Sequence, residues 1–286
     1  MEYINADSLV DTAWVETHLD DPNVRILDGS WHLPATGRDG HAEYTASHIP
    51  GAVHFDINAV SDKTSALPHM LPTANEFADA VSAMGISNEH RVVVYDADGL
   101  FSAPRVWWMF RVFGHDNVAL MSGGYRKWSG EGRQITAEPS SPAPAKFAAT
   151  FNAHMVRSLD QISRFVDDQS ETVLDARAAD RFAGGSPEAR PGVEAGHIPG
   201  SSNLPYGRIV DSGTGMFQDA ETLAEVFKAA NLDAGKPIAT TCGSGVSACI
   251  LGLGLHLMGN DNWSVYDGSW TEWGGRDDTP KAKGSE

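Results

Sequence analysis

The sequence is short of cysteine, which limits both the chemistry and the setting of the protein. Its 286 residues include only Cys242 and Cys249. If both lie on one helix, their positions differ by about 10 Å of axial rise, which is too far for a disulfide. We therefore expect two free thiols and a reducing compartment, the cytoplasm.

Basic side chains are also scarce. Lys and Arg number 21 against 38 Asp and Glu, which gives a formal net charge of −17, and no basic patch with interleaved aromatics is present. Such a chain repels nucleic acids and anionic membranes, so we expect neither as a partner. The longest apolar run, around residues 248–258, is too short to cross a bilayer. We also expect residues 1–7 to be neither a signal peptide nor an anchor.

The two halves of the chain resemble each other. Four segments of the first half recur in the same order in the second: residues 26–29 as 173–176, 47–51 as 196–200, 92–96 as 238–242, and 122–128 as 267–273. A spacing of about 146 residues is far too long for a solenoid repeat and indicates one domain copied once. Prolines 139, 142 and 144 predict a stiff linker between the copies. The expected units are an N-terminal domain over 1–136, a linker over 137–150 and a C-terminal domain over 151–286.

Each half alternates strand-like and helix-like segments. In the first half, residues 24–27 and 92–95 have the apolar runs of strands, whereas 74–84 and 104–113 have the apolar faces of helices. Alternation of this kind predicts the α/β class, with a mostly parallel sheet flanked by helices in each domain.

One stretch of the second half combines a strand, a loop and a helix around a cysteine. Residues 238–241 predict a buried strand, Cys242 opens a loop, and 248–258 predict a buried helix. Gly243 and Gly245 allow the loop to turn its backbone N–H groups inward, which favours an anion at the helix N-terminus. Cys242 would then be partly thiolate at neutral pH. The alternative is a buried structural cysteine.

The copy in the first half has no thiol at this point. Asp96 stands where Cys242 stands in the second half. Only the second half is therefore a candidate for cysteine chemistry, at the carboxyl end of a parallel strand, where ligands bind in open α/β sheets.

Several motifs taken together resemble a known family. They are the loop Cys-Gly-Ser-Gly-Val-Ser-Ala at 242–248, His-Ile-Pro-Gly in both halves, His-Met-Leu-Pro at 69–72, Ser-Ala-Pro-Arg-Val-Trp-Trp at 102–108, and Asp-Ala-Arg at 175–177. From about residue 8 to 275 the chain resembles the tandem-domain rhodanese sulfurtransferases. Its loop is similar to the one found in 3-mercaptopyruvate sulfurtransferases. The resemblance implies two rhodanese-like domains, the first without the catalytic cysteine.

The resemblance also implies an activity. Cys242 would take sulfur from 3-mercaptopyruvate as a persulfide, release pyruvate, and pass the sulfur to a thiol acceptor such as thioredoxin, or to cyanide. A thiolate is the nucleophile that such a step needs. No cofactor and no metal are implied, and a monomer is expected.

Matching to the family motifs assigns further site residues. Substrate binding falls on two arginines and four loop residues: Arg181, Arg190, Gly243, Gly245, Val246 and Ser247. Guanidinium groups suit a substrate carboxylate because they donate two parallel hydrogen bonds. Ser244 and His69 match a proton relay. Its acidic member is here Asn58, which departs from the pattern, and Phe101 stands where a relative carries tyrosine.

Other paired residues have a structural interpretation. His48 and His197 occur in both halves, including the half without a thiol, so we expect both to be structural. Asp28 and Asp175 each close a strand and are expected to cap the following turn.

Rival functions remain open at this point. Thiosulfate:cyanide sulfur transfer would favour cationic side chains in the loop, and residues 243–248 have none. A cysteine phosphatase is excluded, because it needs an arginine six positions after the cysteine, where Ala248 stands. A zinc site is not favoured either, because the two cysteines lack the spacing of zinc ligands. A non-catalytic sulfur-sensing or protein-binding module is the third alternative.

Overall fold

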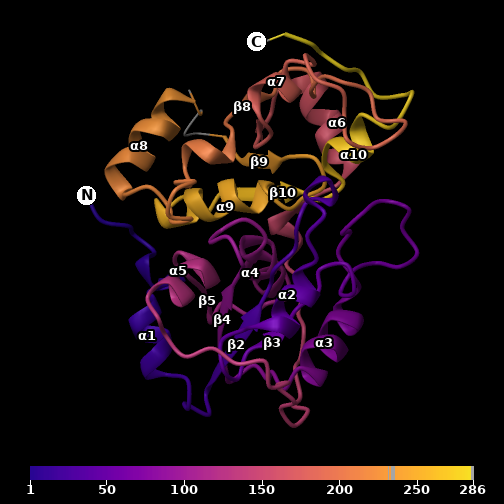
Figure 1. The fold of residues 1–286 in the computed structure, drawn as a ribbon. Coiled ribbons are helices and arrows are strands. Elements are labelled where there is room, and N and C mark those ends of the chain that lie inside the picture. The colour runs from indigo at the N-terminus through magenta and orange to yellow at the C-terminus, as the bar shows by residue number, and fades with distance from the viewer. Residues whose placement is uncertain (231, 233–235, 285–286) are drawn as a thin grey trace.

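The structure is a computed structural model that describes residues 1–230, 232 and 236–284. It contains two five-stranded sheets, one from each half of the chain (Figure 1). The first half gives β1 (Leu9–Val10), α1 (Thr12–Thr17), β2 (Val24–Asp28), α2 (Gly40–Ala46), β3 (Val53–His54), α3 (Ala74–Ala83), β4 (Arg91–Tyr95), α4 (Ala103–Val112), β5 (Val118–Met121) and α5 (Gly124–Gly130). The second gives β6 (Val156–Arg157), α6 (Leu159–Asp168), β7 (Thr172–Asp175), α7 (Ala179–Phe182), β8 (Ser202–Asn203), α8 (Ala220–Ala229), β9 (Ile238–Thr241), α9 (Ala248–Leu257), β10 (Trp263–Tyr266) and α10 (Ser269–Trp273). Short 3-10 turns lie at Ala6–Ser8, Pro34–Thr36, Ala153–Met155 and Tyr206–Arg208.

The two sheets have the same topology. Their strand orders are β1-β5-β4-β2-β3 and β6-β10-β9-β7-β8, and every strand pair is parallel. The predicted α/β class and the predicted duplication are thus confirmed. Because β4 and β9 occupy equivalent central positions, Asp96 and Cys242 emerge at equivalent carboxyl ends of their sheets.

The paired histidines and aspartates have equivalent structural roles. His48 Nδ1 lies 2.7 Å from the Tyr44 carbonyl oxygen, and His197 Nδ1 lies 2.9 Å from that of Phe182. Each imidazole also stacks on the ring of the same residue, at centroid distances of 4.0 and 3.8 Å. Asp28 accepts a hydrogen bond from the Ser30 N–H, and Asp175 accepts one from the Arg177 N–H, as expected of turn caps.

The segment between the domains does more than connect them. No helix or strand forms over residues 138–150, as the prolines predict. Its end nevertheless packs on the first domain, where the Ala145 N–H donates to the Ser82 carbonyl at 2.9 Å. Phe147 is 5% exposed, and its ring lies 5.9 Å from that of Phe77. The segment therefore contributes to the core of the N-terminal domain.

The two domains share a continuous hydrophobic core. Helix α4 packs against α9 where the domains meet, and buried residues of both belong to one cluster (Figure 1). Trp107 of α4 stacks on Trp263 of β10 with ring centroids 6.0 Å apart. Separate clusters cover the outer face of each sheet. The inner face of each sheet is thus covered by its own helix, α4 or α9, and the two helices bury each other.

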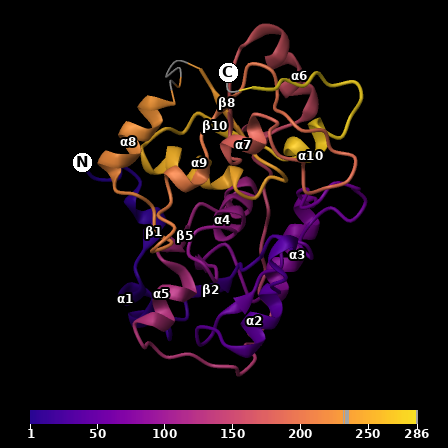
Figure 2. The same cartoon turned by 45° about the horizontal axis from the view of Figure 1, so that its top comes forward.

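The N-terminal residues also cross to the second domain. The Ile4 N–H donates to the Leu257 carbonyl at 2.9 Å, and Asn5 Nδ2 donates to the His256 carbonyl at 2.7 Å. Figures 1 and 2 both place the N-terminus beside α8. Across the described residues, the helices are all too short or too polar to traverse a bilayer.

One helical glycine tests the tightness of the shared core. A Cβ added at Gly252 of α9 would lie 2.3 Å from Trp263 Cζ3. Replacing a helix glycine by alanine ordinarily stabilises by about 0.5–1 kcal/mol. We expect Gly252→Ala instead to destabilise by about 1–3 kcal/mol, because it overpacks the contact between α9 and Trp263, the ring that stacks on Trp107 of the first domain. Urea unfolding measures the change.

Gly130 is the matched control, because a Cβ there would have no atom within 4 Å. Gly130→Ala should leave stability unchanged or raise it. If Gly252→Ala behaves in the same way, the junction is looser than described.

Candidate active site

Cys242 lies in the loop between β9 and α9 and is 2% exposed. Gly245 makes the sharpest turn of this loop, with φ of +76°, and a Cβ there would lie 2.8 Å from Arg105 Nη1 and 3.0 Å from the Asp267 carbonyl oxygen. Only glycine fits both the backbone angle and the space. Among the described residues, no acceptor takes a hydrogen bond from the N–H groups of residues 243–248. The loop therefore surrounds its cysteine with donors that are not engaged elsewhere.

The equivalent loop of the first domain shows what such donors hold. The Asp96 carboxylate accepts hydrogen bonds from the N–H groups of residues 98, 99, 101, 102 and 103, at 2.7–3.1 Å. Burial raises the pKa of Asp96, and these N–H groups lower it in part. The loop is an anion cradle, and in the first domain its own aspartate fills it. From the sequence Asp96 is recognisable only as the residue that stands in place of a thiol, and its role as the bound anion becomes visible only in the structure.

A buried arginine of the first domain donates a hydrogen bond to the cysteine loop. Arg105 of α4 is 1% exposed and donates through Nη1 to the Gly245 carbonyl at 3.2 Å and through Nη2 to the His69 carbonyl. Nη1 also forms an ion pair with Asp267 Oδ1 at 2.7 Å. The second oxygen of Asp267 accepts from the Leu71 N–H at 2.8 Å.

The groups around Arg105 keep its guanidinium charged. Burial by itself would lower the pKa of Arg105, but Asp267 and the nearby thiols of Cys249 and Cys242 more than offset it, and the pKa is raised. Because Arg105 lies outside residues 243–248, the absence of a cationic side chain in the loop did not reveal this charge. Arg105 belongs to the Ser-Ala-Pro-Arg motif and is followed directly by Val106, Trp107 and Trp108. An arginine in such an apolar helix was the signal in the sequence for a buried charge.

Arg181 lies next to the loop, and Arg190 lies close enough to His69 for its charge to lower the pKa of that imidazole. Arg181 Nη2 would be 3.5 Å from a Cβ at Gly243, so its guanidinium lies directly over the loop. It is also paired with Glu188, which forms a second ion pair with Arg177 at 2.8 Å.

Arg190 differs from Arg181 in having no carboxylate partner. Within the described part of the chain it forms no ion pair, and burial lowers its pKa. Of the two predicted substrate arginines, Arg190 thus carries the unneutralised charge.

His69 reaches the same region from the first domain. It is 6% exposed, its backbone is left-handed with φ of +61°, and its ring packs edge-on against Trp31 at 4.8 Å. Neither ring nitrogen has a hydrogen-bond partner. Burial, followed by the charges of Arg105 and Arg190, lowers the pKa of His69 from 6.5 to about 3, so the imidazole is neutral at physiological pH.

The predicted relay is not assembled as a hydrogen-bonded chain. Within the described residues no hydrogen bond joins Ser244 to His69, and Asn58 is exposed with its N–H on Asp56 Oδ1 at 2.7 Å. The roles of Ser244 and His69 stay predictions.

Two other predicted loop residues are placed more clearly. Val246 is 3% exposed, and its side chain packs in the shared core, to which Cys242 also belongs. Ser247 is the N-cap residue of α9, and its side chain makes no capping hydrogen bond.

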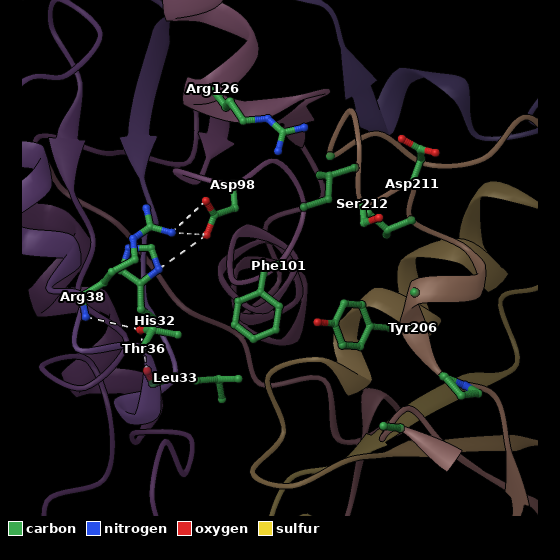
Figure 3. A pocket seen from close by; sticks show the side chains of 16 residues that line it. His32, Leu33, Thr36, Arg38, Asp98, Phe101, Arg126, Tyr206, Asp211 and Ser212 are labelled. Atoms are coloured by element: carbon green, nitrogen blue, oxygen red, sulfur yellow. Dashed lines mark hydrogen bonds and ion pairs between the residues drawn. The ribbon is translucent and has the colours of Figure 1, made fainter. Parts of the chain in front are cut away.

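A cavity of about 550 Å³ opens at the domain junction beside the Asp96 loop. Figure 3 shows Phe101 of the first domain and Tyr206 of the second facing each other across it, with ring centroids 5.7 Å apart. On one wall Asp98 pairs with Arg38 at 2.7 Å. Phe101 also stacks with Trp31 at 6.3 Å, so one row of aromatic rings runs from His69 to this cavity. Cys242 is not among the residues that line it.

The fold and the site define a class of protein: a two-domain α/β enzyme with a single cysteine in an anion cradle at the junction. Comparison with known proteins gives the family. The model of the rhodanese-like domain matches residues 11–131 and 158–276, and the chain belongs to the rhodanese family.

Named relatives refine this picture. The chain is 44% identical over 272 residues to the 3-mercaptopyruvate sulfurtransferase of Rattus norvegicus, covering 93% of this chain and 91% of the relative. It is 42% identical over 273 residues to the thiosulfate sulfurtransferase of Bos taurus, with the same coverage. The crystal structure of SseA from Escherichia coli, described as a 3-mercaptopyruvate sulfotransferase, superposes with a TM-score of 0.84 at 36% identity, covering 92% of this chain and 98% of that one. The protein is a sulfurtransferase, and overall identity differs little between relatives named for the two donors.

The neutral, buried state of His69 predicts a pH dependence of stability. In the unfolded chain His69 binds a proton as the pH falls through about 6.5, whereas in the folded protein it does so only near pH 3. Stability is therefore lost as the pH falls below about 6.5, and at pH 5 the loss from this residue is about 2 kcal/mol.

His69→Asn tests this, because asparagine tolerates the left-handed backbone. The variant should lose about 2 kcal/mol less than the parent between pH 7 and pH 5 in urea unfolding. Equal losses in the two proteins would contradict the buried, neutral imidazole.

Proposed function

We propose that this protein transfers sulfur from 3-mercaptopyruvate to a thiol acceptor through a persulfide on Cys242. The observation that carries the proposal is the cradle of unengaged N–H groups around Cys242, in a loop whose first-domain copy holds a carboxylate through five N–H groups. A thiolate and the terminal sulfur of a persulfide are anions that such donors stabilise.

The first half-reaction makes a sulfur–sulfur bond. The Cys242 thiolate attacks the sulfur of 3-mercaptopyruvate, the carbon–sulfur bond breaks, and its electron pair forms the enolate of pyruvate. The enolate takes a proton and leaves as pyruvate, and the sulfur remains on Cys242. In the second half-reaction an acceptor thiolate attacks the outer sulfur, and the Cys242 thiolate leaves. We assign this acceptor to a thioredoxin-like dithiol, with cyanide as an alternative.

Arg190 and Arg181 position the donor in this proposal. The guanidinium of Arg190, which has no ion-pair partner among the described residues, binds the single carboxylate of mercaptopyruvate. Arg181, which forms an ion pair with Glu188, lies beside the loop at Gly243. The backbone N–H groups of Gly243, Gly245 and Ser247 have no acceptor among the described residues, so they are available to stabilise the reacting sulfur. Because His69 is neutral, it can accept a proton or donate one from its single N–H, but it brings no charge.

Donor choice separates the two sulfurtransferase activities. Thiosulfate is a dianion, and stripping its water needs more positive charge than backbone dipoles supply. Residues 243–248 carry no cationic side chain, and Arg105 beneath them is already paired with Asp267. This favours mercaptopyruvate over thiosulfate.

A reducing compartment suits a chemistry that needs Cys242 as a free thiol, and in our proposal this compartment is the cytoplasm. One relative, from Arabidopsis thaliana, is named as mitochondrial.

Cys242 should be the only essential thiol. Cys242→Ser should abolish sulfur transfer and, by mass spectrometry, the uptake of one sulfur atom from 3-mercaptopyruvate, with an unchanged circular dichroism spectrum. Cys249→Ser should keep most activity, because a hydroxyl can still donate to the Gly245 carbonyl, as the Cys249 thiol does at 3.2 Å. Equal losses in the two variants would refute the assignment.

The donor preference should depend on Arg190. We expect kcat/KM to favour 3-mercaptopyruvate over thiosulfate by about tenfold or more, since a charged hydrogen bond contributes about 1.5–3 kcal/mol. Arg190→Ala should lower kcat/KM for mercaptopyruvate by about ten- to a hundredfold and change the thiosulfate value much less. Arg164→Ala, at an exposed position of α6, is the control. A wild-type protein that uses thiosulfate as well as mercaptopyruvate would establish the thiosulfate alternative instead.

A further inference from the structure

Helix α10 holds the backbone of the cysteine loop through both main-chain and side-chain bonds. The Trp270 N–H donates to the Cys242 carbonyl and the Thr271 N–H donates to the Gly243 carbonyl, each at 2.9 Å. Two hydroxyls add to these. Ser269 Oγ accepts from the Cys242 N–H at 3.3 Å and donates to the Tyr266 carbonyl at 2.8 Å. Thr271 Oγ1 donates to the Gly243 carbonyl at 2.6 Å.

The first domain is an internal control for these contacts. Its equivalent main-chain bonds are present, from the Tyr125 N–H to the Asp96 carbonyl at 2.8 Å and from the Arg126 N–H to the Ala97 carbonyl at 3.2 Å. The hydroxyls are not, because Gly124 and Arg126 stand at the positions of Ser269 and Thr271. The main-chain bonds thus belong to the fold, and the hydroxyl bonds occur only in the domain that carries the thiol.

Ser269 adopts a backbone angle that disfavours serine. Its φ is +51°, and Gly124, its counterpart, has φ of +58°. Glycine takes this conformation without cost, whereas a residue with a Cβ is strained there. Its hydroxyl is fully buried and spans the Cys242 N–H and the Tyr266 carbonyl. Strain of this kind at a functional site indicates that the side chain is needed.

The hydroxyl bonds fix peptide orientations in the loop. In a trans peptide the C=O and the next N–H point in opposite directions. Thr271 holds the Gly243 carbonyl with two donors, so the Ser244 N–H points away from α10. In the first domain the equivalent N–H, that of Asp98, donates to Asp96 Oδ1 at 3.1 Å.

We propose that Ser269 and Thr271 are positioning residues that aim the cradle of N–H groups at the sulfur of Cys242. Ser269 orients the peptide that enters the cysteine, and Thr271 orients the peptide that presents the Ser244 N–H. The inference rests on the proposed role of Cys242 as nucleophile, but it does not depend on which donor supplies the sulfur.

Two variants remove the hydroxyls with little change of shape. Ser269→Gly deletes one hydroxyl and relieves the strain, and Thr271→Val deletes the other at constant volume. Thr271→Ser restores the donor. Thr279→Val is the control, since the Thr279 hydroxyl is buried and bonds to the Trp273 carbonyl of α10 without contact to the loop.

The measurement is the rate of Cys242 alkylation by iodoacetamide across pH, followed on the Cys242 peptide by mass spectrometry, together with the melting temperature. We expect Ser269→Gly and Thr271→Val to shift the midpoint of the alkylation profile upward and to slow persulfide formation in a single turnover by about two- to tenfold. Ser269→Gly should do so with an unchanged or higher melting temperature. Thr271→Ser should restore the wild-type profile, and Thr279→Val should lower the melting temperature with the profile unchanged.

Wild-type alkylation profiles and persulfide rates in both hydroxyl variants would overturn the inference and leave the hydroxyls with a structural role only. A wild-type protein that alkylates at Cys242 but takes no sulfur from either donor would refute the proposed function, and the alkylation profiles of the variants would still decide the positioning role.

Discussion

The structure depends on one buried ion pair that crosses between the domains. Arg105 of the first domain lies 2.7 Å from Asp267 of the second, and Asp267 in turn accepts from the Leu71 N–H. Both side chains are almost fully buried, so removing one partner would leave a charge without compensation, at a cost of about 3–5 kcal/mol. Because the same guanidinium also binds the carbonyls of His69 and Gly245, the register between the domains and the shape of the cysteine loop are set together.

The same loop geometry has a structural role in the first domain and a reactive role in the second. In the first domain the cradle is filled by Asp96, which completes its hydrogen bonds internally and stabilises the turn before α4. In the second, Cys242 leaves the N–H groups of residues 243–248 without an acceptor in the part of the chain that the structure describes. The difference between a structural loop and a reactive one is therefore whether the protein itself supplies the anion.

Much of this could be predicted from the sequence, because it depends on local pattern. The strand, loop and helix around Cys242 follow from an apolar run interrupted by glycines, and β9 and α9 lie where that pattern places them. The role of Arg105 could not be predicted, because Gly245 and Asp267, its partners, lie far along the chain and meet it only when the domains dock. Val246 shows a different limit: the motif gives its position, but packing turns its side chain into the core. The Ser244–His69 relay depends on side-chain orientation, which spacing alone does not determine.

The core that runs through α4 and α9 has a consequence for how the two copies can change over time. Each helix covers the inner face of its own sheet and is itself covered by the other domain. Either domain alone would therefore expose the apolar side chains of its helix to water. The second domain consequently depends on the copy without a thiol for its stability. Its α4 supports the helix that follows Cys242, and its loop between β3 and α3 supplies His69, so mutations that loosen it lower the stability of the whole chain as one cooperative unit. The copy without a thiol is thus constrained by its fit to the other domain rather than by reactivity.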